Sequence, residues 1–147
     1  MFDPTKEVPS LELCKELKEL GFPQKGAGYF WIKTEDGEWG LYLIDEQIYD
    51  GERVEVCDKK YVAVGYLEED ATYLKVKEII KAPTLREIGE WLPEGFEEFK
   101  LDGKFWVKDK RDYNYLVNDE NEANARTKML IWLVKNGYIC FYENKEG

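Results

Sequence analysis

The sequence predicts an α+β fold with a largely antiparallel sheet, two short helices and one long C-terminal helix. Three capped segments with apolar residues at helical spacing occur at residues 9–21, 84–92 and 119–136. Segments of alternating polarity joined by turn residues lie between them. The chain has 147 residues, of which 44% are hydrophobic, so we expect a single domain over residues 1–147.

Each predicted helix carries its own end signals. Ser10 and Thr84 are suited to cap the two short helices at their N-termini. Asn118 or Asp119 is expected to cap the long helix, which ends at Asn136. The apolar positions of the long helix predict that it packs centrally on the sheet; they are Ala125, Met129, Leu130, Trp132 and Leu133.

The predicted strands are short and bounded by turn residues. We expect them at residues 29–34, 38–44, 53–57, 61–67, 73–81, 99–109, 113–117 and 138–142. The pair Asp102-Gly103 predicts a turn inside the segment 99–109.

Two halves of the chain share a pattern. Residues 9–22 match residues 83–96 in their Pro-Ser/Thr-Leu start and Gly-Phe end, and Phe30-Trp31-Ile32-Lys33 matches Phe105-Trp106-Val107-Lys108. We interpret this as an internal duplication of a helix–hairpin unit. Convergence on common cap and strand signals is the alternative. The two units would cover about residues 9–45 and 83–118.

Strand alternation separates the aromatic residues of this pattern into two faces. One face is assigned to the core and carries Phe30, Ile32, Phe105 and Val107. The other face bears lysine and forms a candidate aromatic face of Trp31, Tyr42 and Trp106. It is either a recognition surface or a face covered by a helix, with lysine stems lying across the rings.

The negative charge is unevenly distributed. The net charge is −10, and residues 36–70 hold eleven acidic and three basic residues, a net of −8. This sign opposes nonspecific binding to nucleic acid or an anionic membrane. It suits a protein partner with a basic surface, which the segment would attract by imitating nucleic-acid phosphates. The candidate acidic surface consists of Asp36, Glu38, Asp45, Glu46, Asp50, Glu52, Glu55, Glu68, Glu69 and Asp70.

The residues that are absent exclude several chemistries. The chain contains no histidine, which excludes Ser-His-Asp and Cys-His catalysis and the common zinc ligand sets. Cys14, Cys57 and Cys140 lie far apart, and we expect reduced thiols. We therefore expect no catalytic residue, cofactor or metal. A hard cation held by the acids at 45–46 or 68–70 is an alternative to solvated loops.

We expect a cytoplasmic protein. The longest apolar run, residues 129–134, is too short to cross a membrane, and residues 1–7 show no signal peptide pattern.

Three segments resemble a group of small uncharacterised proteins from bacterial phages and prophages. The segments are Pro9–Gly21, Lys81–Pro93 and Ala125–Tyr138. The resemblance implies a bacterial, cytosolic accessory protein and carries over no catalytic residues.

Three functions follow as hypotheses. The first is a noncatalytic protein that binds a basic host or phage protein through the acidic surface. The second is a small ligand-binding protein or an enzyme without histidine, with a cleft between the two repeat units. The third is a structural homodimer that associates through the candidate aromatic face.

Overall fold

The structure is a computed structural model that describes residues 3–24, 28–44, 61–64, 72–110 and 115–141. The chain divides into two compact units. The helical unit comprises residues 1–23 and 83–147, and the sheet unit comprises residues 24–82. Whether the two units fold as one domain is not decided by this division, so the single domain over residues 1–147 stays a prediction.

The α+β fold class is confirmed, with two short helices and one longer helix. They are α1 (Leu11–Glu19), α2 (Leu85–Trp91) and α3 (Glu122–Lys135), and a short 3₁₀ helix η1 (Pro4–Lys6) precedes them. Every strand pairing in the described part of the chain is antiparallel. The strands form two sheets, in the orders β2-β1-β4-β3 and β5-β6-β7.

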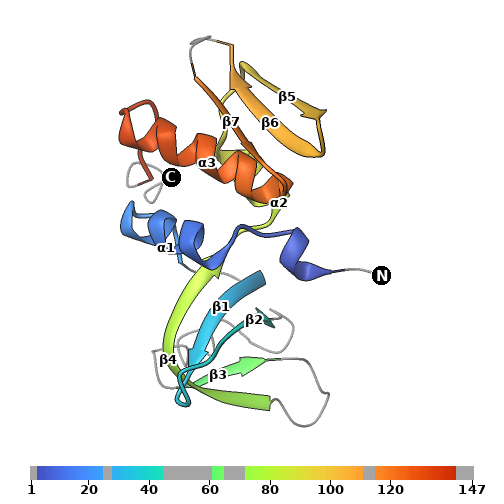
Figure 1. Cartoon of the computed structure of the whole chain (residues 1–147). Helices are drawn as coiled ribbons and strands as arrows, with labels where there is room; N and C mark the ends of the chain where they lie inside the picture. The colour runs from blue at the N-terminus through green and yellow to red at the C-terminus, as the bar shows by residue number, and fades with distance from the viewer. Residues whose placement is uncertain (1–2, 25–27, 45–60, 65–71, 111–114, 142–147) are drawn as a thin grey trace. The chain divides into compact units, whose positions relative to one another are not determined.

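The four-stranded sheet belongs to the sheet unit (Figure 1). Its strands are β1 (Gly28–Thr34), β2 (Trp39–Ile44), β3 (Tyr61–Val64) and β4 (Thr72–Ala82). The predicted strands at 29–34, 38–44 and 73–81 are confirmed, as is the part of 61–67 that is described. The predicted strand at 53–57 lies outside the described residues.

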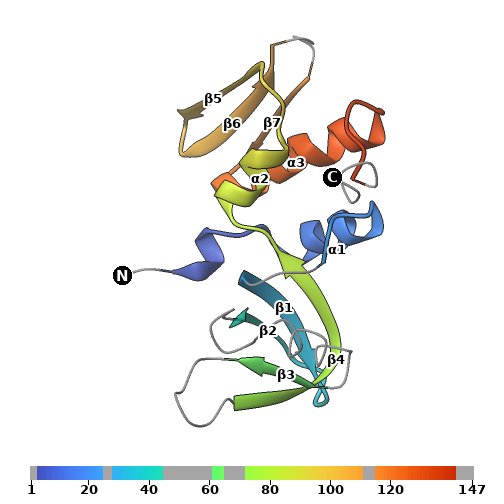
Figure 2. The same ribbon diagram turned by 180° about the vertical axis from the view of Figure 1, so that it is seen from behind.

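The three-stranded sheet belongs to the helical unit, and α3 packs against it (Figures 1 and 2). Its strands are β5 (Phe96–Leu101), β6 (Lys104–Asp109) and β7 (Leu116–Asp119). The predicted turn at Asp102-Gly103 is confirmed, and both residues have positive φ angles, 53° and 75°. Gly103 adopts this left-handed conformation without the steric cost that a Cβ atom would add.

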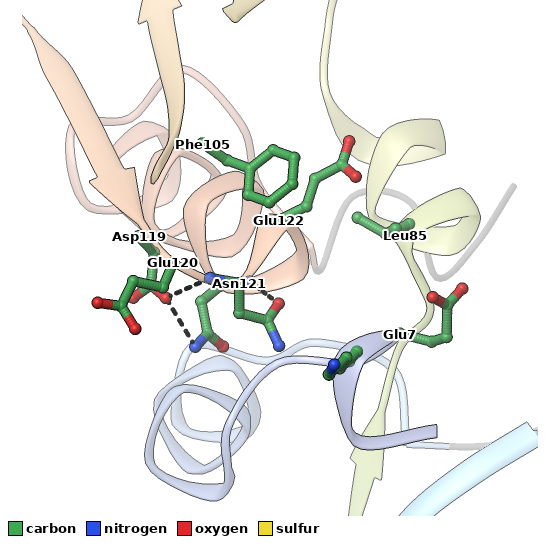
Figure 3. A pocket seen from close by; sticks show the side chains of 9 residues that line it. Glu7, Leu85, Phe105, Asp119, Glu120, Asn121 and Glu122 are labelled. Atoms are coloured by element: carbon green, nitrogen blue, oxygen red, sulfur yellow. Dashed lines mark hydrogen bonds between the residues drawn. The ribbon is translucent and has the colours of Figure 1, made fainter. Parts of the chain in front are cut away.

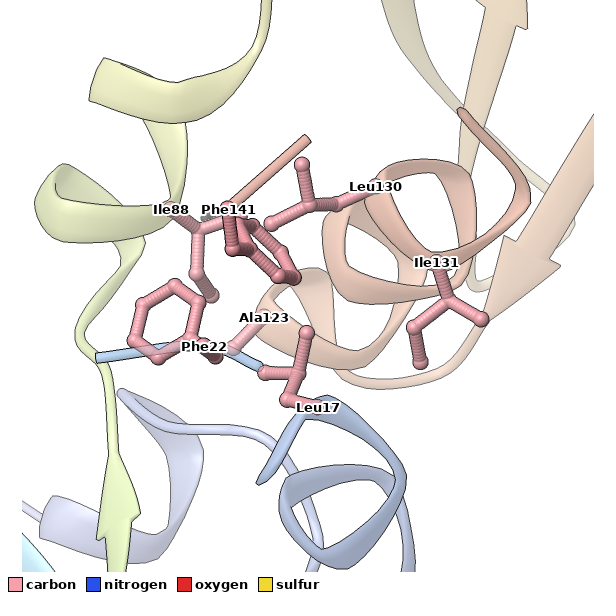
Figure 4. Close-up of a cluster of buried hydrophobic side chains, with 7 residues drawn as sticks. All are labelled: Leu17, Phe22, Ile88, Ala123, Leu130, Ile131 and Phe141. Atoms are coloured by element: carbon pink, nitrogen blue, oxygen red, sulfur yellow. The ribbon is translucent and has the colours of Figure 1, made fainter. Parts of the chain in front are cut away.

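Helix α3 is buried on two sides, as expected for a central helix. Against β6 and β7 it presents Ala125, Met129 and Leu133. Towards α1 and α2 it presents Ala123, Leu130 and Ile131, which pack with Leu17, Phe22, Ile88 and Phe141 (Figure 4). The ring of Phe141 meets those of Phe22 and Trp91 edge-on, at centroid distances of 5.1 and 5.0 Å.

Two predicted boundaries at this end of the chain are wrong. The cap of α3 is Asn121, not Asn118 or Asp119, because pairing with β6 keeps the chain extended as far as Asp119. Residues 138–141 form no strand. The chain instead turns back at the end of α3, where the backbone N–H of Tyr138 donates to the carbonyl of Leu133.

The proposed duplication remains a hypothesis. Gly21 and Gly95, which end the two matching segments, have similar φ angles of 100° and 102°. The motif at 30–33 lies in the first strand after α1, whereas the motif at 105–108 lies in the second strand after α2. The strand β5 therefore has no counterpart between α1 and β1 among the described residues.

Candidate binding pocket at the start of helix α3

The helical unit contains a pocket of about 650 Å³ at the N-terminus of α3 (Figure 3). This volume lies within the usual range for ligand sites. One lysine and four carboxylates line it, together with two asparagines and two apolar side chains. The lining residues are Lys6, Glu7, Leu85, Phe105, Asp119, Glu120, Asn121, Glu122 and Asn124.

The base of the pocket is a hydrogen-bonded network around Asp119. Its carboxylate accepts from the backbone N–H of Asn121 at 2.9 Å and from Asn124 Nδ2 at 3.2 Å. Its second oxygen lies 3.0 Å from Lys128 Nζ. Burial alone raises the pKa of Asp119, but these bonds together outweigh it and lower the pKa. Asp119 is therefore an ionised structural group.

Two asparagines hold the N-terminal segment against α3. Asn121 Oδ1 caps the helix by accepting from the N–H of Asn124 at 3.0 Å, while its Nδ2 donates to the carbonyl of Thr5 at 3.2 Å. Asn124 Oδ1 accepts from the N–H of Ser10 at 2.7 Å. These bonds fix the segment that contributes Lys6 and Glu7 to the pocket.

Two carboxylates near the pocket share one guanidinium group. Arg126 Nη2 lies 2.9 Å from Glu98 and 3.0 Å from Glu122, and its Nη1 donates to the carbonyl of Leu85. Burial raises the pKa of Glu122, and Glu98 and then Glu7 raise it further against the opposing effect of Arg126. Glu98 and Glu122 therefore compete for the guanidinium group of Arg126.

The apolar side of the pocket consists of Leu85 and Phe105. Phe105 was expected in the core, but it is only half-buried. The other residues assigned to the core, Phe30, Ile32 and Val107, are buried as predicted. The ammonium group of Lys100 lies 5.2 Å from the centroid of the Phe105 ring. The ring therefore already contacts one cation.

This arrangement suits binding of a positively charged group. Carboxylates outnumber bases in the lining, and the apolar side can contact a hydrocarbon stem. Among the described residues, no group of three or more Cys, Asp or Glu side chains is placed to hold a metal ion.

The predicted acidic surface is only partly described. Asp36 and Glu38 are exposed in the turn between β1 and β2. Asp36 accepts from the hydroxyl of Thr34 and from the N–H of Glu38, and these bonds lower its pKa. The other candidate residues, Asp45, Glu46, Asp50, Glu52, Glu55, Glu68, Glu69 and Asp70, lie outside the described residues.

The structure does not unite the predicted aromatic face on one sheet. Tyr42 lies opposite Phe30 in the register of β1 and β2, so it shares the side of Phe30, not that of Trp31. Trp31 and Trp106 belong to separate sheets. Trp106 stacks on Phe99 at a centroid distance of 6.2 Å. Tyr42 is on the other side because of the register between β1 and β2. Trp31 and Trp106 could not be assigned to a common side because strand alternation fixes sides only within one sheet.

Cys14 and Cys140 form no disulfide within the described part of the chain, and Cys57 lies outside the described residues. The Sγ atom of Cys14 lies 3.5 Å from the carbonyl oxygen of Pro9. No helix in the described ranges has the length and apolar character needed to cross a membrane.

Sequence reasoning did not find the pocket. Its residues come from η1 and the turn after it, α2, β6, the end of β7 and the start of α3, most of which are far apart in the chain. The available signal was the polar run Asp119–Glu122, which reads equally well as an ordinary helix start. Comparisons with family models, curated proteins and solved structures found no match to this chain.

Proposed function

We propose that this chain is a noncatalytic binding protein that acts on a protein partner with a basic surface. The observation that carries the proposal is the excess of carboxylates around the pocket, four against one lysine. Residues 36–70 add a second acidic region with a net charge of −8. Opposite charges steer association and favour a basic partner over an acidic one.

The same charge argues against direct contact with nucleic acid. Such contact gains most of its affinity from lysine and arginine side chains placed on phosphates. A chain with a net charge of −10 instead competes with nucleic acid for a basic protein. The bacterial phage or prophage setting and the cytoplasmic location are part of this proposal, and they rest on the resemblance of residues 9–21, 81–93 and 125–138 and on the sequence pattern.

The test compares partner capture from a bacterial lysate by three forms of the tagged protein. One is unchanged, one carries Asp45→Asn, Glu46→Gln and Asp50→Asn, and one carries Glu7→Gln and Glu120→Gln. We expect proteins captured at low salt and released at high salt, with several-fold less capture by at least one neutralised form.

A matched control keeps the total charge comparable. Glu90→Gln with Glu94→Gln removes two exposed carboxylates outside the pocket lining. This control should capture as much partner as the unchanged protein. Equal capture by all four forms, or capture that salt does not change, would refute the proposed function.

A second candidate function is binding of a small organic cation in the same pocket. Its volume of about 650 Å³ is the observation in favour. The pocket does not correspond to the predicted cleft between repeat units, because seven of its nine lining residues lie outside residues 9–45 and 83–118.

A further inference from the structure

The chemistry of the group that the pocket binds follows from where its carboxylates lie. Figure 3 shows the carboxylates of Glu7 and Glu122 on the Leu85 side of the pocket, whereas that of Glu120 is directed to the opposite side. Glu7 and Glu122 both line the pocket, and the charge of Glu7 contributes to the raised pKa of Glu122. The negative potential is therefore concentrated beside Leu85 and Phe105.

The charges already present leave room for one more cation. Arg126 contacts Glu98 and Glu122, so one positive charge serves two carboxylates, and Glu7 is a third. Lys6 also lines the pocket, but among the described residues no ion pair joins it to these carboxylates. Within residues 3–24, 28–44, 61–64, 72–110 and 115–141, no ion pair reaches Glu7. A further cation between Glu7 and Glu122 would offset their mutual repulsion.

The apolar residues restrict what kind of cation fits. Leu85 and Phe105 form a hydrocarbon surface beside the two carboxylates. A bare metal ion gains nothing from such a surface, whereas an alkyl chain that ends in a charge buries its stem and keeps its head on the carboxylates. The ammonium group of Lys100 already makes a cation–π contact with the Phe105 ring, so a cation near this ring is compatible with the structure.

We propose that the pocket receives an alkylammonium or alkylguanidinium group between Glu7 and Glu122, with its stem on Leu85 and Phe105. This inference rests on the proposed function, for which a lysine or arginine side chain of the basic partner is the source. The segment that carries Glu7 is held in place by the hydrogen bonds that Asn121 and Asn124 make to the backbone of Thr5 and Ser10.

The experiment is an NMR titration of the whole protein with blocked amino acids. The probes are Nα-acetyl-arginine amide, Nα-acetyl-lysine amide and the uncharged Nα-acetyl-norleucine amide, which has a stem of similar length. We expect the two cationic probes to shift amide signals of residues 6–7, 85, 105 and 120–124, and norleucine to leave them in place. Equal shifts with norleucine would overturn the proposal.

Two variants test the role of the carboxylate. Glu7→Gln should weaken binding of the arginine probe by about three- to tenfold, because it removes one of two charge partners. Glu94→Gln removes an exposed carboxylate outside the lining and should change affinity by less than about twofold. Similar affinities for the two variants would overturn the assignment of Glu7.

A further pair of probes separates the two sources of such a cation. A blocked Gly-Arg-Gly peptide should bind at least as tightly as agmatine, the free alkylguanidinium amine. Tighter binding of agmatine would refute the claim that the bound cation is a side chain of a protein partner, and it would assign the site to a free small cation. If lysate capture falls with the variant at residues 45, 46 and 50 but not with the variant that carries Glu7→Gln and Glu120→Gln, the proposed function stands and the pocket's part in it is refuted.

Discussion

Replacing Asn121 removes two hydrogen bonds that act on different parts of the helical unit. Its Oδ1 caps α3, and its Nδ2 holds the carbonyl of Thr5. Loss of an asparagine cap costs about 1 kcal/mol, and an exposed hydrogen bond contributes about 0.5–1 kcal/mol. Asn121→Ala should therefore lower the free energy of unfolding by about 1.5–2 kcal/mol.

Asn121→Ser separates the two contributions. Serine caps helices about as well as asparagine, but its short hydroxyl cannot also reach Thr5. This variant should lose only about 0.5–1 kcal/mol. Urea unfolding followed by far-ultraviolet circular dichroism measures both variants, and the dependence on urea should stay the same as in the unchanged protein. Equal losses for alanine and serine would refute the capping role, because only the cap distinguishes them.

Two further predictions concern polar groups of the same unit, one fully buried and one half-buried. Thr127 is fully buried in α3, and its Oγ1 has no hydrogen-bond partner among the described residues. Thr127→Val should therefore raise the free energy of unfolding by about 1 kcal/mol. Thr127→Ser keeps the hydroxyl and loses a methyl group, so it should lower the free energy of unfolding. In contrast, the pKa of Asp119 is lowered in the folded protein. Its ionised form therefore stabilises the fold at pH values above its pKa in the unfolded chain, which is about 4. This contribution is lost as the pH falls through the pKa of the folded state. The difference in unfolding free energy between the protein and Asp119→Asn should shrink between pH 6 and pH 3 in urea unfolding, and a constant difference would contradict the reasoning.

The helices could be predicted because their determinants are adjacent in the sequence. Ser10 caps α1, and Thr84 forms a reciprocal capping box with Glu87, both over three residues. The start of α3 was placed too early because pairing between β6 and β7 decides it, and that pairing is not visible from local signals. The division of the strands into two sheets was missed for the same reason.

The candidate site lay beyond sequence reasoning because its geometry depends on long-range hydrogen bonds. Nothing near Thr5 in the sequence indicates that Asn121 will hold it, since 116 residues separate them. Similarly, the guanidinium of Arg126 joins α2, β5 and α3 through Leu85, Glu98 and Glu122. Composition correctly indicated an acidic protein, but it could not show which acids share a cavity.

The four carboxylates of the pocket should contribute unequally to the binding of a cation. Asp119 is already bound by Lys128 and two asparagines, and Glu122 is paired with Arg126. Glu120 is directed away from Leu85 (Figure 3). Glu7 is the lining carboxylate that faces the apolar side without a described ion-pair partner. Binding of a cation should therefore depend more on this residue, and on the asparagines that hold its segment, than on the more numerous acids of α3.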